Sequence, residues 1–183
     1  MSVSLLIPAY NAAPFIPELL QNAEDQNHPF DEILVYDDAS TDDTARVARE
    51  HGARVIEGEE NRGAGYARNQ LLAAAETQFV HFHDADDTFI HPAFVERLLP
   101  HAGAETAVLC NWRAHNADES PPDTYTYDPQ EDWARFFIGG HVHLNATIYP
   151  RQFVHHHGGF DPEMRIQQDL LLNAEMAGHG LSY

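Results

Sequence analysis

Lysine is absent from this sequence, and positive charge is scarce. All 10 basic residues are Arg, against 29 Asp and Glu residues, so the formal net charge is -19 at pH 7. Such an acidic chain is repelled by polyanions, which argues against nucleic acid or an anionic membrane as its partner. A phosphorylated ligand would therefore need local help from a bound cation, from a few Arg side chains or from backbone N–H groups.

Cysteine and long apolar runs are nearly absent as well. Cys110 is the only Cys, so no disulfide can form within the chain, and its apolar neighbours suggest a small core residue. No window approaches the roughly 18 uninterrupted apolar residues of a membrane-spanning helix, and the N-terminus lacks the pattern of a signal peptide. We therefore expect a cytoplasmic protein, with peripheral membrane association through a partner left open.

The remaining pattern predicts one α/β domain. A length of 183 residues suits a single domain with a substantial core. Short apolar runs alternate with segments of helical periodicity. The expected strands cover residues 3–7, 32–36, 54–57, 79–83 and 106–112, and the expected helices cover residues 15–23, 40–51, 64–76, 92–99 and 128–137. This order predicts a mostly parallel sheet with helices on both faces.

Three local features add detail to this outline. Ser40 and Asp43 have the spacing of a capping box at the start of the second helix. The polar segment 114–127 is expected to be a long loop. The His triplet at 155–157 is expected on the surface of a helix.

Chemically useful side chains follow the expected strands at their carboxyl ends, where sheets of this kind bind ligands. Tyr10 offers a ring on which a nucleobase could stack, and Asp37 could accept hydrogen bonds from that base. Each feature also has an ordinary structural interpretation. Tyr10 could cap the core, and Asp38 could only prepare the helix that follows.

The acidic run after the fourth strand is the strongest single feature. Asp84 and Asp86 alternate, so their side chains can point the same way and converge on one divalent cation and on a phosphate that the cation neutralises. Acidic residues after a strand are also common turn formers and helix starts. The run alone therefore leaves both interpretations open.

A glycine-containing segment precedes the third helix. Residues 61–65 place Gly63 and Gly65 at a helix start, where free N–H groups and the helix dipole favour an anion. Their spacing does not match a dinucleotide-binding fingerprint, which argues against a Rossmann dehydrogenase.

The combination resembles a known family. Residues 7–11 (Ile-Pro-Ala-Tyr-Asn), 35–44, 61–69 and 83–87 (His-Asp-Ala-Asp-Asp) are similar in order and spacing to the family 2 glycosyltransferases. Residues 158–163, followed by Asp169, also look like that family. The resemblance extends from residue 1 to about residue 180.

This resemblance implies a GT-A fold and inverting transfer of a sugar from a nucleoside diphosphate, with a UDP-sugar as the leading donor, to a hydroxyl of a saccharide or lipid-linked acceptor. It also implies a divalent cation, Mn or Mg. By motif position, the donor would be bound by Pro8, Ala9, Tyr10, Asp37, Asp38, Gly63, Arg68, Asp84 and Ala85, and the metal by Asp84 and Asp86. Residues 1–115 would form the nucleotide-sugar half and residues 116–183 the acceptor half, which is expected to be truncated relative to the family.

Asp169 is the expected catalytic base. An inverting displacement needs a base opposite the leaving group to take the proton of the acceptor hydroxyl. Asp169 holds the second position of the family's usual Glu-Asp pair, but Gln168 stands in the first. Gln keeps the shape and loses the charge, so transfer is less firmly implied than donor binding.

Three alternatives remain at this point. Residues 81–86 (His-Phe-His-Asp-Ala-Asp) superficially resemble the His-x-His-x-Asp element of metal-dependent hydrolases, which makes a zinc hydrolase one alternative. His141 and His143 repeat the His-x-His spacing, although His81 and His83 would share a strand face only with each other. A non-catalytic nucleotide-sugar-binding module would fit Gln168. A nucleotidyltransferase would share the fold and the metal chemistry.

Overall fold

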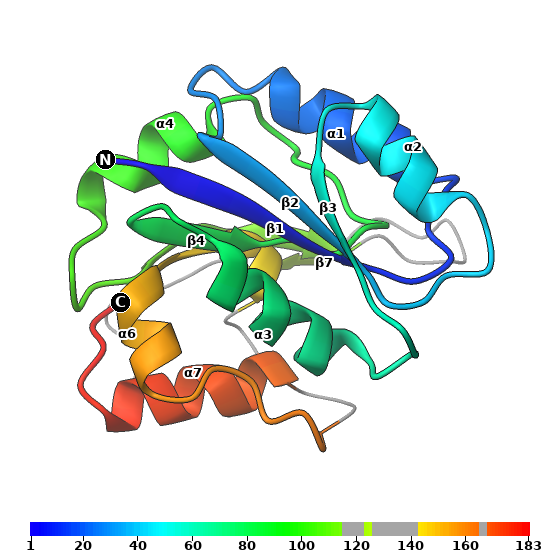
Figure 1. The fold of residues 1–183 in the computed structure, drawn as a ribbon. Coiled ribbons are helices and arrows are strands. Elements are labelled where there is room, and N and C mark those ends of the chain that lie inside the picture. The colour runs from blue at the N-terminus through cyan, green and yellow to red at the C-terminus, as the bar shows by residue number, and fades with distance from the viewer. Residues whose placement is uncertain (115–122, 126–142, 165–167) are drawn as a thin grey trace.

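A six-stranded sheet organises the computed structural model, which describes residues 1–114, 123–125, 143–164 and 168–183 (Figure 1). The strand order is β3-β2-β1-β4-β8-β5. Parallel pairs join β1 to β2, β1 to β4 and β2 to β3, whereas β8 runs antiparallel to both β4 and β5. The strands are β1 (Val3–Ala9), β2 (Glu32–Asp37), β3 (Arg54–Glu57), β4 (Phe79–Phe82), β5 (Val108–Leu109) and β8 (Thr147–Pro150).

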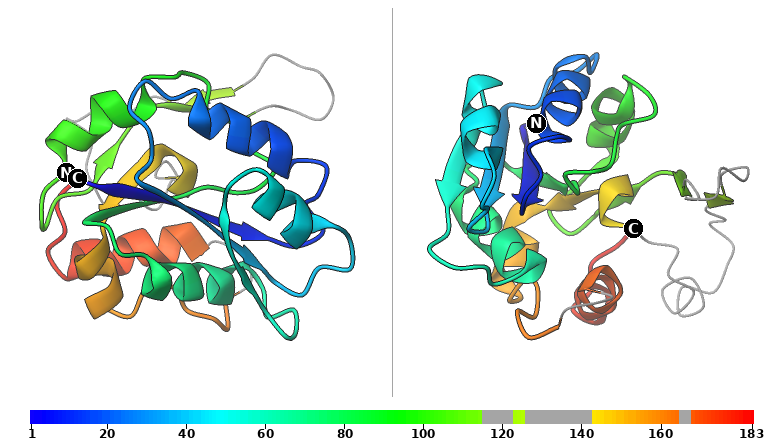
Figure 2. Two further views of the ribbon diagram at one scale, coloured as in Figure 1. Left: turned by 45° about the horizontal axis from the view of Figure 1, so that its top comes forward. Right: turned by 90° about the vertical axis from the view of Figure 1, so that its right-hand side faces the viewer.

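Helices cover both faces of this sheet, as the sequence predicts (Figures 1 and 2). One layer holds α1 (Ile16–Glu24), α2 (Thr44–Glu50) and α4 (Phe94–Leu98), and the other holds α3 (Ala64–Ala74), α6 (Arg151–His156) and α7 (Gln168–Gly178). Single turns of 3-10 helix, η1 (Leu99–His101) and η2 (Leu144–Ala146), complete the helical segments described. The expected helix over residues 128–137 lies outside the described residues.

The central strand explains why the two layers have separate cores. Every residue of β1 is buried. Because side chains alternate along a strand, Leu5 and Ile7 enter the cluster beneath α1, while Leu6 enters the cluster beneath α3. A near-continuous apolar run is what a strand covered on both faces requires.

The second half of the sheet differs from the sequence-based expectation. The strand expected over 106–112 is only Val108–Leu109, and the chain then leaves the sheet to form β6 (Trp112–Ala114), which pairs with β7 (Asp123–Tyr125). Part of the expected loop 114–127 is therefore a strand pair. The antiparallel strand β8 was not predicted, because a four-residue strand carries little periodic signal. Cys110 is half-buried, and burial raises the pKa of its thiol to about 11.

The capping box at Ser40 and Asp43 was wrong. The helix begins at Thr44, and Asp43 makes no side-chain capping bond. The carboxylate of Asp42 caps the helix instead, since it accepts from the Thr44 N–H at 3.0 Å. Ser40 Oγ accepts from the Asn11 N–H at 2.9 Å. Competing short polar side chains in one turn made the choice of cap ambiguous from spacing alone.

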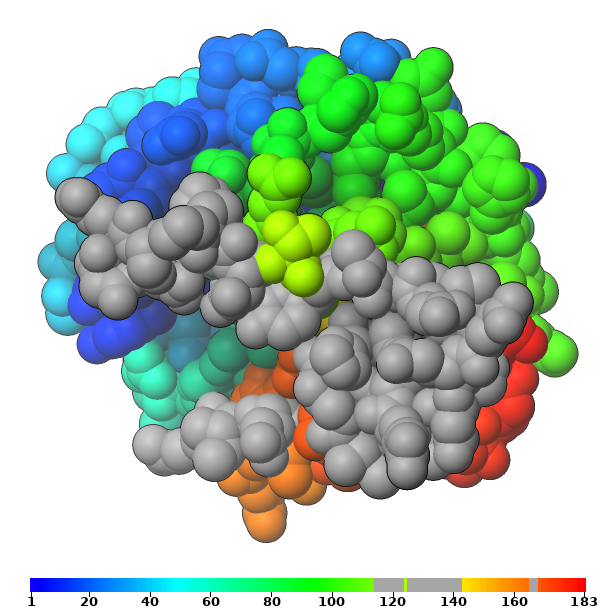
Figure 3. Space-filling view, turned by 180° about the vertical axis from the view of Figure 1, so that it is seen from behind, coloured from blue at the N-terminus to red at the C-terminus, as the bar shows by residue number. Residues whose placement is uncertain are grey.

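The reverse of the molecule joins segments that are distant in sequence. Seen from behind, the green segment before residue 114 occupies the upper right of this face, and the red C-terminal residues lie at the lower right, below it (Figure 3). A backbone bond from the Ala107 N–H to the Ser182 carbonyl, 2.8 Å long, ties the chain end to the segment before β5. None of the helices in the described ranges has both the length and the apolar character needed to cross a bilayer.

Candidate active site

Backbone bonds gather the predicted motifs at one edge of the sheet. The chain leaving β2 is tied to β1, because the Asp38 N–H donates to the Ala9 carbonyl at 2.8 Å. The chain leaving β4 is tied to β1 in the same way, from the His83 N–H to the Leu6 carbonyl at 3.0 Å. The connections run outward in opposite directions from β1 and β4, so this edge contains the switch point at which open α/β sheets bind ligands.

An open pocket of about 230 Å³ lies at this switch point. Its lining combines five of the predicted site residues with four others, namely Pro8, Tyr10, Asp84, Ala85 and Asp86 with Asn11, Ala12, Phe15 and Ala64. None of these lining residues is basic. The described lining therefore combines apolar and aromatic side chains with two carboxylates, and it includes no positively charged side chain that could neutralise a phosphate directly.

The loop after β1 presents Tyr10 to this pocket. Asn11 adopts a positive φ of 51°, a conformation that Asn tolerates better than most residues. Its side chain accepts from the Thr41 N–H at 2.8 Å, which ties this loop to the one after β2. Tyr10 and Phe15 are each 50% exposed, so both rings are accessible to a flat ligand.

The two carboxylates at the end of β2, Asp37 and Asp38, are buried. Asp37 is buried, and its Oδ1 accepts from the Ser40 N–H at 3.2 Å. Asp38 is also buried and accepts from the N–H groups of Arg62, at 3.0 Å, and Gly63, at 2.7 Å. The anion at the start of α3 is thus the carboxylate of Asp38. The Gly63 N–H, expected to be free for a ligand, has an internal partner, and neither aspartate lines the pocket.

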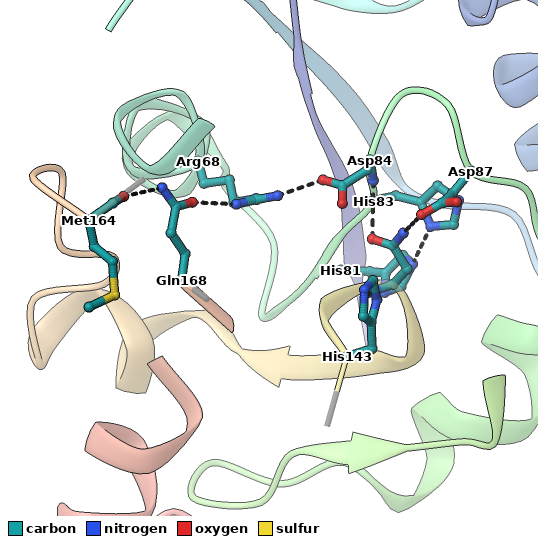
Figure 4. Close-up of polar contacts among 9 residues, drawn as sticks. Arg68, His81, His83, Asp84, Asp87, His143, Met164 and Gln168 are labelled. Carbon is teal, nitrogen blue, oxygen red and sulfur yellow. Dashed lines mark hydrogen bonds and ion pairs between the residues drawn. The ribbon is translucent and has the colours of Figure 1, made fainter. Parts of the chain in front are cut away.

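Arg68 on α3 links the pocket to the last helix (Figure 4). Arg68 is 7% exposed, and it donates from Nη2 to Asp84 Oδ1 at 2.6 Å and from Nη1 to Gln168 Oε1 at 2.6 Å. A buried cation needs such partners to offset its lost hydration. Arg68 is one of the predicted donor contacts, but the structure places it behind Asp84, away from the pocket lining.

Asn145 is a site residue that the sequence analysis missed. Its Oδ1 accepts from the backbone N–H of Asp84 at 3.1 Å, and its Nδ2 donates to Asp87. Burial, reinforced by Asp84 and Asp86, raises the pKa of Asp87. Asn145 therefore fixes the turn that carries the acidic run. It lies in η2, beyond any local motif, so no sequence signal pointed to it.

The histidines before the acidic run do not form a zinc site. His81 and His83 are buried and bond to each other, with Nε2 of His81 3.1 Å from Nδ1 of His83. The other ring nitrogen of His81 lies 2.9 Å from the Thr147 carbonyl, and His83 stacks on Phe89. Within the described ranges, no group of three or more His, Cys, Asp or Glu side chains is arranged to hold a metal ion. His141, which the hydrolase pattern also invoked, lies outside those ranges.

These buried imidazoles predict a specific sensitivity to acid. Burial lowers the pKa of His81 well below its usual value and lowers that of His83 to about 3. The unfolded chain therefore binds protons below about pH 6.5 that the folded chain does not, and each His should reduce stability by up to about 1.4 kcal/mol per pH unit as pH falls below that value.

The His81→Phe variant should lose one of these two contributions. Urea unfolding at about pH 7, 6 and 5 should give a shallower loss of stability than in the wild type, even though the variant is less stable at neutral pH because it loses the Thr147 bond. The matched control is His155→Phe, at an exposed position on α6. Equal pH slopes for the wild type and His81→Phe would show that His81 is not held neutral.

Asp169, the predicted base, lies in the first turn of α7 beside Gln168. It is partly exposed, and its Oδ1 accepts from the Leu170 N–H at 2.9 Å. Its charge adds to burial in raising the pKa of Tyr149, which places its carboxylate near that buried phenol. Asp169 does not line the pocket at the switch point. The structure thus gathers Tyr10, Asp84 and Asp86 in the pocket and connects Asp169 to them through Gln168 and Arg68.

This arrangement is that of a GT-A protein. The mostly parallel sheet between two helical layers, the pocket at its switch point and the Asp-x-Asp run after β4 agree with what the family resemblance implies. Solved structures agree: residues 1–349 of S. aureus TarS superpose with a TM-score of 0.76 at 26% identity, covering 96% of this chain and 55% of that chain. The mannosyltransferase PcManGT from Pyrobaculum calidifontis, solved with GDP-Man and Mn2+, shares the fold with a TM-score of 0.75 at 24% identity, covering 98% of this chain and 53% of that one.

The chain belongs to glycosyl transferase family 2, whose sequence model matches residues 4–158. Among related proteins, EpsH of Bacillus subtilis (strain 168) is 31% identical over 170 residues, which is 85% of this chain and 49% of EpsH. The glycosyltransferase GlyG of Streptococcus pneumoniae serotype 4 is 25% identical over 136 residues, or 72% of this chain and 45% of GlyG. The chain therefore spans about half the length of these relatives.

Proposed function

We propose that this chain binds a nucleoside-diphosphate sugar, with a UDP-sugar as the leading candidate, and transfers the sugar with inversion to a hydroxyl of a saccharide or lipid-linked acceptor. The observation that carries the proposal is the shared pocket of Tyr10, Asp84 and Asp86 at the switch point of the sheet. Two related structures support the choice of donor, because S. aureus TarS has been solved with UDP, at 26% identity, and with UDP-GlcNAc, at 25% identity.

The residues present fit a divalent cation whose coordination is completed by the phosphates of the substrate. Asp84 and Asp86 are two carboxylates on one pocket, and Mg²⁺ is commonly held by one or two carboxylates together with substrate phosphates and water. One oxygen of Asp84 already accepts a hydrogen bond from Arg68, so Asp86 is the better candidate for a direct ligand of the cation. A bound Mn or Mg would stabilise the charge that develops on the leaving diphosphate.

Each remaining residue has a defined task in this proposal. Tyr10 stacks on the base, while Pro8, Ala9 and Asp37 shape the nucleoside end. Asp38 and Gly63 order the start of α3, and Arg68 orients Asp84. Asp169 removes the proton of the acceptor hydroxyl. Residues 1–115 would supply most of the donor site, and residues 116–183 would supply the acceptor side.

Product analysis tests the reaction class directly. The purified protein is incubated with Mn and a panel of nucleotide sugars, with and without simple saccharide acceptors, and the released phosphates are identified. A glycosyltransferase releases a nucleoside diphosphate. Release of pyrophosphate would indicate a nucleotidyltransferase, and binding without turnover would favour the non-catalytic binding module.

The Tyr10→Ala variant should weaken nucleotide binding without affecting the metal site. Stacking of a base on an aromatic ring is worth about 1–3 kcal/mol, so the Kd for the nucleoside diphosphate should rise by at least about fivefold. The Tyr10→Phe variant keeps the ring and serves as the control, with a Kd close to that of the wild type. Calorimetric titration measures both. Equal affinities of Tyr10→Ala and the wild type for the nucleotide would show that Tyr10 does not stack on the base.

A further inference from the structure

Gln168 is held by two opposed hydrogen bonds at the start of α7. Its Oε1 accepts from Arg68 Nη1 at 2.6 Å, and its Nε2 donates to the Met164 carbonyl at 2.5 Å (Figure 4). A carboxamide that accepts at one end and donates at the other has a single orientation that satisfies both partners. The amide is therefore fixed, although it carries no charge.

The guanidinium of Arg68 contacts Gln168 on one side and the pocket carboxylate Asp84 on the other. Arg68 Nη2 donates to Asp84 Oδ1 at 2.6 Å, and the two side chains lie in opposite directions from Arg68 (Figure 4). A guanidinium is planar and rigid, so fixing one nitrogen constrains the other. The contacts thus run without a break from a pocket carboxylate to the residue immediately before Asp169.

Gly65 supplies the space that Gln168 occupies. A Cβ atom at Gly65 would lie 2.8 Å from Gln168 Nε2 and 3.3 Å from the Asp161 carbonyl oxygen. Gly65 and Arg68 are three residues apart on α3, so they share one face of the helix. This face of α3 is shaped around the Gln168 amide.

An uncharged amide is sufficient at position 168. Arg68 is nearly buried and pairs with Asp84, which leaves one cation for one anion. The acceptor oxygen of Gln168 keeps the contact with Arg68 without a second negative charge. The feature that matters at position 168 is then the acceptor oxygen, which Gln and the Glu usual in this family both provide.

We propose that Gln168 is a positioning residue that acts through Arg68 to place Asp169 relative to the donor carboxylate Asp84. The inference rests on the proposed sugar transfer. Gln168 does not touch substrate in this account. Its loss should therefore slow the chemical step while leaving donor binding intact, because Asp84 and Asp86 remain in the pocket.

Two substitutions at position 168 separate the acceptor oxygen from the shape of the side chain. Gln168→Met keeps the length and removes both hydrogen bonds, so kcat should fall by about 10- to 100-fold with the KM for the donor within about twofold of the wild type. Gln168→Glu keeps the acceptor for Arg68 and loses only the donor to the Met164 carbonyl, so its kcat should fall clearly less than that of Gln168→Met. Thermal unfolding and circular dichroism establish that each variant is folded.

A substitution on the facing helix displaces the amide without changing any polar group. Gly65→Ala should push Gln168 from its place and lower kcat as Gln168→Met does. Ala is a better helix former than Gly, and this gain offsets part of the lost packing. The Tm of Gly65→Ala should therefore stay close to that of the wild type, although its kcat falls. Gly178→Ala is the matched control, because a Cβ at Gly178 meets nothing within 4 Å, and it should keep the wild-type kcat.

The outcomes distinguish this inference from the proposed function. A wild-type protein that turns over no donor overturns both. If the wild type turns over donor, two results overturn the positioning role alone. One is a wild-type kcat in Gln168→Met, and the other is a kcat in Gln168→Glu as low as that in Gln168→Met. If Gln168→Met fails to fold, Gly65→Ala decides, and a wild-type kcat in that variant overturns the role.

Discussion

Replacing Asp86 by Ala is expected to lower the affinity for a nucleoside diphosphate in the presence of Mn by about 30-fold or more. Asp86 lines the pocket beside Asp84, and the described lining residues include no basic side chain that could take over the diphosphate. Asp86 is exposed in the free protein, and a bound cation and diphosphate would cover its carboxylate. Truncating one partner of a covered charge pair costs about 2–5 kcal/mol, which corresponds to a loss of about 30-fold or more in affinity. Calorimetric titration of UDP and GDP with added Mn measures the effect.

Two controls for Asp86→Ala distinguish the loss of a metal ligand from the loss of one negative charge on the protein. Glu59→Ala removes one exposed carboxylate near the same edge of the sheet and should bind as the wild type does. In excess chelator, Asp86→Ala and the wild type should bind equally weakly. If Asp86→Ala retained the full response to Mn, Asp86 would not be a metal ligand.

Replacing Asp169 by Asn should remove transfer and spare donor binding. A general base contributes about 10²- to 10⁴-fold to the rate, so kcat should fall by about 1,000-fold while the Kd for the donor stays near that of the wild type. Asn keeps the size of the side chain and can still accept from the Leu170 N–H. Steady-state kinetics and calorimetry with the same donor measure the two quantities.

A carboxylate on the same helix provides the control for Asp169. Glu175→Gln neutralises an exposed residue of α7 and should leave kcat unchanged. The Asp169→Asn effect should exceed that of Gln168→Met, because a positioning residue affects the base only indirectly. An Asp169→Asn variant with the wild-type kcat would exclude Asp169 as the base.

Features that depend on local pattern could be predicted from the sequence. The apolar runs that became β1, β2 and β4 were recognisable, and parallel pairing then brought the residues after each strand to one edge. Tyr10, Asp84 and Asp86 meet in the pocket for this reason. Family resemblance added Asp169, whose role as base is still a prediction.

Features that depend on long-range contacts could not be predicted in this way. Asn145 supports the acidic run from a short turn after residues 126–142, and its partners are fixed only by how β8 pairs with β4. The sequence left Asp38 with a donor contact or a structural role, and it gave no sign that the carboxylate would accept from the N–H groups of Arg62 and Gly63 at the start of α3. A polar residue at a strand end has several possible partners, and the folded backbone decides among them.

The central claim is that the switch-point pocket binds a nucleoside diphosphate through a divalent cation held by its carboxylates. A thermal-shift titration of the wild-type protein with nucleoside diphosphates, with Mn and then with excess chelator, tests it most directly, because a ligand that binds only the folded state raises the Tm. The account predicts a rise in Tm that requires nucleotide and Mn together and disappears with the chelator. The same rise in the presence of the chelator, or no rise with any nucleoside diphosphate, would contradict it.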